Sequence, residues 1–191
     1  MLGSTTQKDI DSGGGDVVGR DKIINKRIGK VKISQLRKLF QTLVEERDNE
    51  IKISKISEEL NDYLTERDVI GLPSKLKEAG CSDNYLNDAE FIKHKFAKKL
   101  YHFQEYPSAQ KIYVLIMAHV IELFRAKILP NIDDYTDLAK VDNKLFEEVI
   151  VPIVDALHSE TSEDEVLYIN HEEIRGMIYF LTGRCHLRWV L

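Results

Sequence analysis

From Lys32 onward, apolar residues recur three and four positions apart, the spacing that places them on one face of an α-helix. The pattern predicts helices over 32–49, 54–66, 83–105, 108–129, 144–158 and 171–182, and a short one that follows Pro73 and ends at Ala79. The segment 108–129 is apolar nearly all round, so we expect it at the centre of the core. The sequence therefore predicts an all-α fold, a multi-helix bundle around a central hydrophobic helix, with an N-terminal β-hairpin arm and a short extended C-terminal tail.

Residues that satisfy free backbone groups mark the expected helix ends. We expect polar N-caps at Ser82 or Asp83, at Ser108, at Asp142 or Asn143, and at Asn170. Gly80 and Gly183 follow helical patterns, where glycine is free to adopt the positive φ of a C-terminal cap. Pro152 lies inside the pattern of 144–158 and should kink or split that helix. Residues 131–142 and 159–165 are expected to be acidic loops.

The first 31 residues lack the helical pattern. Residues 1–15 are polar, end in three glycines and are expected to be disordered. Residues 16–31 contain two short β-branched pairs around a Gly-Arg-Asp turn, which predicts a small hairpin. Strands this short need a partner edge, which copies of the chain would provide. We therefore expect a homo-oligomer whose interface includes Val17, Val18, Gly19, Arg20, Asp21 and Ile23, and a helical interaction domain over 32–191.

Charge is unevenly distributed along the chain. Residues 1–38 carry nine Lys/Arg and four Asp, which gives a net charge of +5, and the remaining residues carry a net charge of −10. The basic arm suggests two partners, nucleic acid or an acidic surface of a neighbouring copy. We favour the neighbouring copy, because no aromatic residue before Phe40 offers a platform on which bases could stack. Nucleic-acid binding by this chain alone is not expected.

The C-terminal tail is basic and aromatic, and it contains the one Trp of the chain. Trp and Arg are enriched among the residues that dominate binding energy at protein interfaces. We therefore predict partner docking through Arg184, His186, Arg188 and Trp189. Trp189 has a second interpretation of nearly equal weight, in which the tail lies on its own helical body and the indole fills a groove there.

No combination of residues in the sequence fits a catalytic, metal or cofactor site. None of the six histidines forms the His-Glu-x-x-His spacing that places two metal ligands on one helix face. The cluster Asp133-Asp134-x-x-Asp137 is expected to be solvated, and Gly13-Gly14-Gly15 is not followed by the Gly-Lys-Ser/Thr of a phosphate-binding loop. His119 is interpreted as a hydrogen-bonded core histidine. We expect a protein that is not an enzyme and binds neither metal nor cofactor.

Features of membrane or secreted proteins are not evident. The richest apolar run, Ile112 to Ile121, is about ten residues long, whereas a bilayer span needs about twenty. The N-terminus has no apolar signal segment, and two cysteines do not make a disulfide framework. We expect a cytoplasmic chain with reduced thiols and no membrane partner.

Several stretches resemble one family. Gly15-Asp16-Val17-Val18-Gly19-Arg20-Asp21-Lys22-Ile23 is similar to a short motif that joins effector domains to C-terminal modules in bacterial conflict proteins. Four further stretches resemble the C-terminal domain of ABC-three-component systems, which are similar to the Lamassu type of antiphage defence: 64–72, 96–101, 108–113 and 176–189. The last of these, Gly-Met-Ile-Tyr-Phe-Leu-Thr-Gly-Arg-Cys-His-Leu-Arg-Trp, is the most specific. The resemblance covers about residues 15–189.

This resemblance implies an all-helical adaptor that carries an effector, often a nuclease, and docks it on an SMC-like ATPase together with a small helical middle component. About fourteen residues precede the motif here. We therefore expect either an adaptor without an effector or a fragment of a longer effector protein, and no catalytic residue carries over. The expected function is a non-catalytic interaction and oligomerisation module of an antiphage defence complex. The alternative is a nucleic-acid-binding regulator that uses the basic arm.

Overall fold

A computed structural model of the chain describes residues 35–67, 70–130, 138–159 and 166–189. Within these ranges all regular secondary structure is helical, which confirms the expected all-α class. The expected disordered segment 1–15 and the expected hairpin 16–31 lie outside the described residues.

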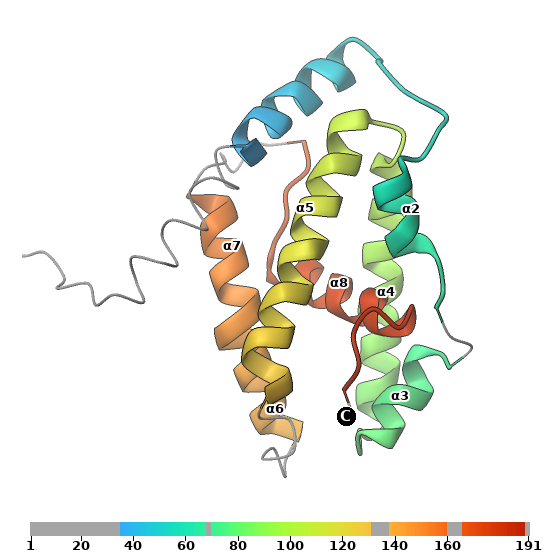
Figure 1. Cartoon of the computed structure of the whole chain (residues 1–191), viewed down its shortest axis with the longest axis vertical. Helices are drawn as coiled ribbons and strands as arrows, with labels where there is room; N and C mark the ends of the chain where they lie inside the picture. Colours follow the sequence, from blue (N-terminus) through green and yellow to red (C-terminus); the bar gives the residue numbers. More distant parts are fainter. Residues whose placement is uncertain (1–34, 68–69, 131–137, 160–165, 190–191) are drawn as a thin grey trace, which may run out of the picture.

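Figure 1 shows the arrangement of the described helices. A helix over 35–48 is followed by α2, α3 and α4, whose bounds are Glu58–Leu64, Leu72–Glu78 and Asp83–Phe103. The second half contains α5 (Pro107–Leu123), the π-helical turn η1 (Phe124–Ile128), α6 (Leu138–Leu145), the π-helical turn η3 (Phe146–Ile150), α7 (Val151–His158) and α8 (His171–Gly183).

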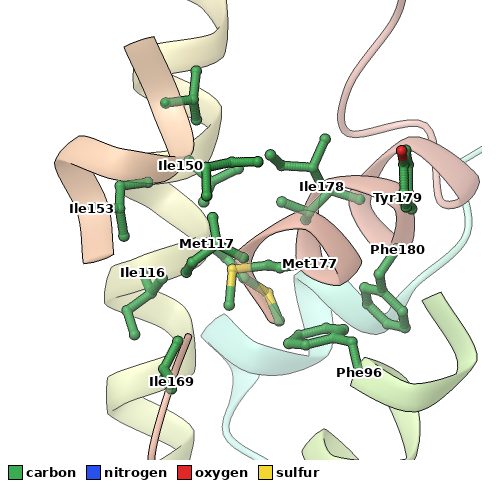
Figure 2. Close-up of a cluster of buried hydrophobic side chains, with 14 of the residues drawn as sticks. Phe96, Ile116, Met117, Ile150, Ile153, Ile169, Met177, Ile178, Tyr179 and Phe180 are labelled. Carbon is green, nitrogen blue, oxygen red and sulfur yellow. The ribbon is translucent and has the colours of Figure 1, made fainter. Parts of the chain in front are cut away.

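Helix α5 is central, as its apolar pattern predicts. It contacts α2, α4, α7 and α8, and it lies between α7 on one side and α2 on the other in Figure 1. Met117 of α5 is fully buried and meets Met177 of α8 in a cluster that also includes Ile150 and Ile178 (Figure 2). These side chains come from α5, η3 and α8, and Phe96 of α4 lies in the same cluster (Figure 2), so the core joins the two halves of the chain.

Helices α4 and α8 make the closest helix pair, and Gly176 is the reason. A Cβ at this position would lie 2.7 Å from Phe96 Cβ and 2.8 Å from the Ile92 carbonyl oxygen, both on α4. Such distances are well inside van der Waals contact. Only glycine allows the two backbones to approach this closely.

Several predicted helix ends are confirmed. Ser82 Oγ accepts a hydrogen bond from the Tyr85 N–H at 3.4 Å, and Gly80 has a φ of +84°. Asn170 Oδ1 accepts from the Glu173 N–H at 3.0 Å, and Glu173 Oε2 accepts from the Asn170 N–H at 3.2 Å. This reciprocal pair is a capping box, and it fixes the start of α8.

The predicted N-cap of the central helix is wrong by two residues. Tyr106 is the N-cap of α5 and Pro107 occupies the first turn, where its missing N–H costs nothing. Ser108 lies inside the helix instead of capping it. Its N–H and hydroxyl both donate to the buried carboxylate of Glu46, at 3.0 Å and 2.8 Å. A carboxylate from another helix thus satisfies the α5 N-terminus, which no local pattern reveals.

The expected helix 54–66 is shorter in the structure and begins at Glu58 because Ser57 is its N-cap. The residues before it are held by other contacts. The Ile53 N–H donates to the Glu105 carbonyl at 2.8 Å, and the Gln110 side chain bonds the Ser57 N–H at 2.7 Å and the Lys55 carbonyl at 3.2 Å. Long-range hydrogen bonds have replaced those of a helical turn.

The expected acidic loop 131–142 is wrong over its last residues, and so is an N-cap at Asp142 or Asn143. Helix α6 already begins at Leu138, because Val141 and Leu145 are buried against the body. Of the two outcomes expected at Pro152, a split is wrong, because α6, η3 and α7 follow one another without a break from Leu138 to His158. The irregularity is the π-helical turn η3, which ends at Ile150, and the Val151 N–H bonds back five residues to the Phe146 carbonyl.

The expected cap at Gly183 is also wrong. Gly183 is the last residue of α8, and the positive φ occurs two residues later, at Cys185, where it is +62°. The tail that follows bends back over the body instead of running extended. The left-handed conformation of Cys185 produces this reversal. Cysteine is not a residue type that favours a positive φ, so the sequence gives no signal for it.

Candidate functional site

The C-terminal tail folds onto the end of α8 through its backbone. The His186 N–H donates to the Leu181 carbonyl at 2.9 Å, and the Leu187 N–H donates to the same oxygen at 3.4 Å. His186, Leu187 and Trp189 are all buried. The tail is therefore part of the folded body through Trp189.

Trp189 fills a groove of its own chain, which is one of the two interpretations of the sequence. Its side chain is 6% exposed, and its ring packs against Phe124 with centroids 5.6 Å apart. The indole Nε1 donates to Thr182 Oγ1 at 2.9 Å, and Thr182 in turn donates to the Ile178 carbonyl at 2.8 Å. A buried indole needs such an acceptor, and Thr182 supplies it.

Arg184 ties the tail to α2 and α4. Its guanidinium donates to the Leu64 carbonyl and to the Tyr101 hydroxyl, the latter at 3.3 Å, and it lies 4.9 Å from the Phe180 ring centroid. Glu66 is 3.9 Å away. Arg188, in contrast, is exposed. Of the four residues predicted to dock a partner, Arg188 is therefore the most accessible, Arg184 is partly so, and His186 and Trp189 are covered.

Lys75 of α3 is a residue that the sequence reasoning missed. Its Nζ donates to the Thr182 carbonyl and to Cys185 Sγ, both at 2.6 Å, and it lies 3.4 Å from the Gly183 carbonyl oxygen. A cation at the C-terminal end of a helix is favourable because the last carbonyl groups carry partial negative charge. Lys75 is more than a hundred residues from its partners, so no local pattern identifies it.

A cationic recess lies where the tail passes between the end of α2 and η1. Two neighbouring cavities of about 360 and 610 Å³ are both lined by Arg67, Arg125 and His186. Arg188 lines the smaller cavity, and Tyr63 and Glu122 line the larger one.

Burial and the nearby Arg67 lower the pKa of His186, so the imidazole is neutral at physiological pH. The backbone carbonyls of Tyr63 and Thr65 oppose this change. The His186 ring also packs against the Tyr63 ring, with centroids 5.5 Å apart. The His186 side chain thus packs the tail against α2.

A second, more apolar groove of about 730 Å³ lies between the helix over 35–48 and α5. Leu39, Val114 and Leu115 line it, and Glu46 and Ser108 form part of its polar edge. Lys38, Glu59 and Lys111 also line it.

The partly buried polar network between α4, α6 and α8 is structural. The Tyr85 hydroxyl donates to Asp142 at 3.2 Å, the Tyr179 hydroxyl donates to Tyr85 at 2.9 Å, and Arg175 forms an ion pair with Asp142. Burial is the largest cause of the raised pKa of Tyr85. Each hydroxyl has a partner, so the network links three helices without leaving a reactive group.

Residues that bear on catalysis or metal binding are dispersed. Across 35–67, 70–130, 138–159 and 166–189, no three His, Cys, Asp or Glu side chains are close enough together to bind a metal ion. The interpretation of His119 as a core histidine is wrong, because its side chain is partly exposed on α5. Its Nδ1 lies 3.5 Å from the Glu122 carboxylate. The Asp133–Asp137 cluster and the predicted interface residues from Val17 to Ile23 lie outside the described residues.

Membrane insertion finds no support in the described part of the chain, where each helix is too short or too polar to cross a bilayer. The thiols of Cys81 and Cys185 are free.

Comparison with known proteins identifies the family. Neither curated proteins nor solved structures provide a match. Residues 71–189 match the family described as C-terminal domain 9 of the ABC-three component (ABC-3C) systems. The matched range starts at the N-cap of α3 and ends at Trp189, so it includes the α4–α8 pair, the central helix and the tail. The chain belongs to this family of C-terminal domains of ABC-three-component systems.

Proposed function

We propose that the chain is a non-catalytic protein-protein interaction module of a cytoplasmic, Lamassu-like antiphage defence complex, and that it docks on the SMC-like ATPase of its system beside the small helical middle component. The observation that carries this proposal is the family match over 71–189. The His, Cys, Asp and Glu side chains of the described helices do not gather at one place, which is consistent with a role in binding.

The exposed part of the tail is the proposed docking surface. Arg188 is exposed, and Arg184 presents one edge beside Tyr101, which is 44% exposed. The buried residues His186 and Trp189 act indirectly, because they hold the two arginines in place. Arginine beside an aromatic ring is a common composition for the centre of a protein interface.

Co-expression with the SMC-like ATPase and the middle component of the same system tests this docking. The intact chain should co-purify with the ATPase, and Arg188→Glu should weaken the complex. Arg47→Glu is the control, since Arg47 is also an exposed arginine, on the helix over 35–48. Equal loss with both variants would indicate a non-specific charge effect and would contradict a docking role for the tail.

Self-association is proposed to depend on the N-terminal arm and its residues Val17 to Ile23. A variant that lacks residues 1–30 should lose self-association and keep its helicity, because the first buried core residue within the described ranges is Leu36. Sedimentation measures the first effect and circular dichroism the second. A collapse of helicity would contradict this division of the chain.

The alternative function, nucleic-acid binding through the arm, is favoured by the net charge of +5 over residues 1–38. It predicts an affinity for DNA or RNA that falls steeply with added salt and disappears with the arm. The net charge of −10 on the rest of the chain opposes this function by repelling phosphates.

A further inference from the structure

The two cavities beside the tail form one recess with an excess of positive charge. Both are lined by Arg67 and Arg125, and Arg188 lines the smaller one. All three arginines are exposed, so their guanidinium groups are available at the mouth of the recess. The one carboxylate among the described lining residues is Glu122, at the larger cavity.

These three arginines have no ion pair with a carboxylate of the described residues, unlike several other basic residues packed on the same body. Lys93, Lys99 and Arg175, for example, each lie within ion-pairing distance of an acid. Arg67 and Arg125 also both act on the Tyr63 hydroxyl, whose pKa they lower against a larger effect of burial. The two guanidinium groups therefore converge on one wall of the recess.

His186 adds a buried polar atom to the same place. The residue is 6% exposed and lines both cavities, and its Nε2 has no hydrogen-bond partner among the described residues. A buried nitrogen without a partner is unfavourable, and such atoms are uncommon in folded proteins. A ligand that can both donate and accept hydrogen bonds would satisfy Nε2 in either tautomer of the ring.

We propose that this recess binds the phosphate group of a small phosphorylated molecule. The planar guanidinium groups of Arg67 and Arg125 match phosphate oxygens in bidentate geometry. With its proton on Nε2, His186 can donate to a phosphate oxygen. A phosphate monoester offers three oxygens and up to two negative charges to the arginines, whereas a carboxylate offers two oxygens and one charge, so phosphate is the better match to the recess. The apolar wall of Ile121 and Ala118 beside Tyr63 leaves room for the organic part of the molecule in the larger cavity.

Isothermal titration calorimetry on the intact chain tests this inference with inorganic phosphate, a 5′-mononucleotide and the corresponding nucleoside. The mononucleotide should bind and the nucleoside should not. Arg67→Gln and Arg125→Gln should each weaken binding about tenfold, the loss expected for one charge-assisted hydrogen bond. Arg47→Gln, which removes an exposed arginine elsewhere, should leave the affinity unchanged. Since the substituted arginines are exposed, the variants should fold, and circular dichroism checks this.

The relative affinities identify the source of the phosphate group. Tighter binding of the mononucleotide than of inorganic phosphate supports a phosphorylated organic ligand, and equal binding supports free phosphate in the same site. Binding of the nucleoside, no binding of any phosphate probe, or equal loss in the Arg47 control would overturn the proposal. The titration needs no ATPase, so its result is independent of the docking experiment above.

Discussion

Replacing Gly176 by alanine tests the closest contact of the fold. In an ordinary helix this change is stabilising by about 1 kcal/mol, because alanine has the higher helix propensity. Here the new Cβ would lie 2.7 Å from Phe96 Cβ and 2.8 Å from the Ile92 carbonyl oxygen, about 1 Å closer than ordinary contact. The second neighbour is backbone, so α4 and α8 must separate.

The expected magnitude follows from these opposing effects. Overpacking of a core contact costs about 1–3 kcal/mol, and a forced movement of backbone places this contact at the upper end. After the gain in helix propensity, Gly176→Ala should lower the free energy of unfolding by about 1–2 kcal/mol. For a chain of this size the melting temperature should fall by about 2–8 °C.

Gly183→Ala is the matched control in the same helix. A Cβ there would meet Leu72 Cβ at 3.6 Å and Lys93 Cδ at 3.7 Å, which is ordinary contact. Since Gly183 has no positive φ, alanine should stabilise the protein by about 0.5–1 kcal/mol. Urea unfolding followed by circular dichroism measures both variants. If Gly176→Ala is as stabilising as Gly183→Ala, the close helix crossing described here is wrong.

Three further substitutions have defined outcomes. Glu46→Gln removes the charge that binds both donors of Ser108 and should lower the free energy of unfolding by about 1–2 kcal/mol in urea titrations at neutral pH; no change would contradict the capping role of Glu46. Trp189→Phe keeps a ring on Phe124 but loses the hydrogen bond to Thr182, so a loss of about 1–2 kcal/mol is expected, and an unchanged thermal midpoint would mean that the indole does not anchor the tail. The pKa of His186 is lowered in the folded state, so the unfolded chain binds the extra proton first and stability should fall as pH drops below the unfolded value of about 6.5. His186→Asn should reduce this loss between neutral and mildly acidic pH, and an identical pH profile would refute it.

Local pattern was sufficient for much of the fold. The apolar stretch of α5 predicts the central helix, and Ser82, Gly80 and Asn170 are confirmed as caps because each acts on backbone groups within three or four residues. Pro152 likewise lies in the first turn of α7, directly after the π-helical turn η3, since the missing N–H has a purely local effect. Features with a local cause were therefore predictable.

The remainder depended on contacts distant in sequence. Ser108 was expected to cap α5, but Glu46 replaces it from another helix. The start of α6 at Leu138 is set by burial of Val141 and Leu145, which overrides the acidic composition around them. The positive φ at Cys185 depends on how the tail folds against α3 and α8, and Gly183 was the stronger local signal for it.

The candidate site divides in the same way. The sequence identified the tail as the informative segment and left two roles open for Trp189, and the structure gives it the groove-filling one. Because the tail reverses at Cys185, His186 and Trp189 are buried. Arg188 is exposed and Arg184 is partly exposed. The cationic recess needed the structure, since Arg67, Arg125 and Arg188 come from three separate segments with no common motif.

The proposed docking of this domain on the SMC-like ATPase depends on the exposed part of its C-terminal tail. Size-exclusion chromatography with light scattering on the purified chain and the SMC-like ATPase of its system tests it directly. The account predicts a stable complex with the intact chain and with Arg47→Glu, and separate elution with Arg188→Glu. Separate elution of the intact chain and the ATPase, or an unweakened complex with Arg188→Glu, would contradict it.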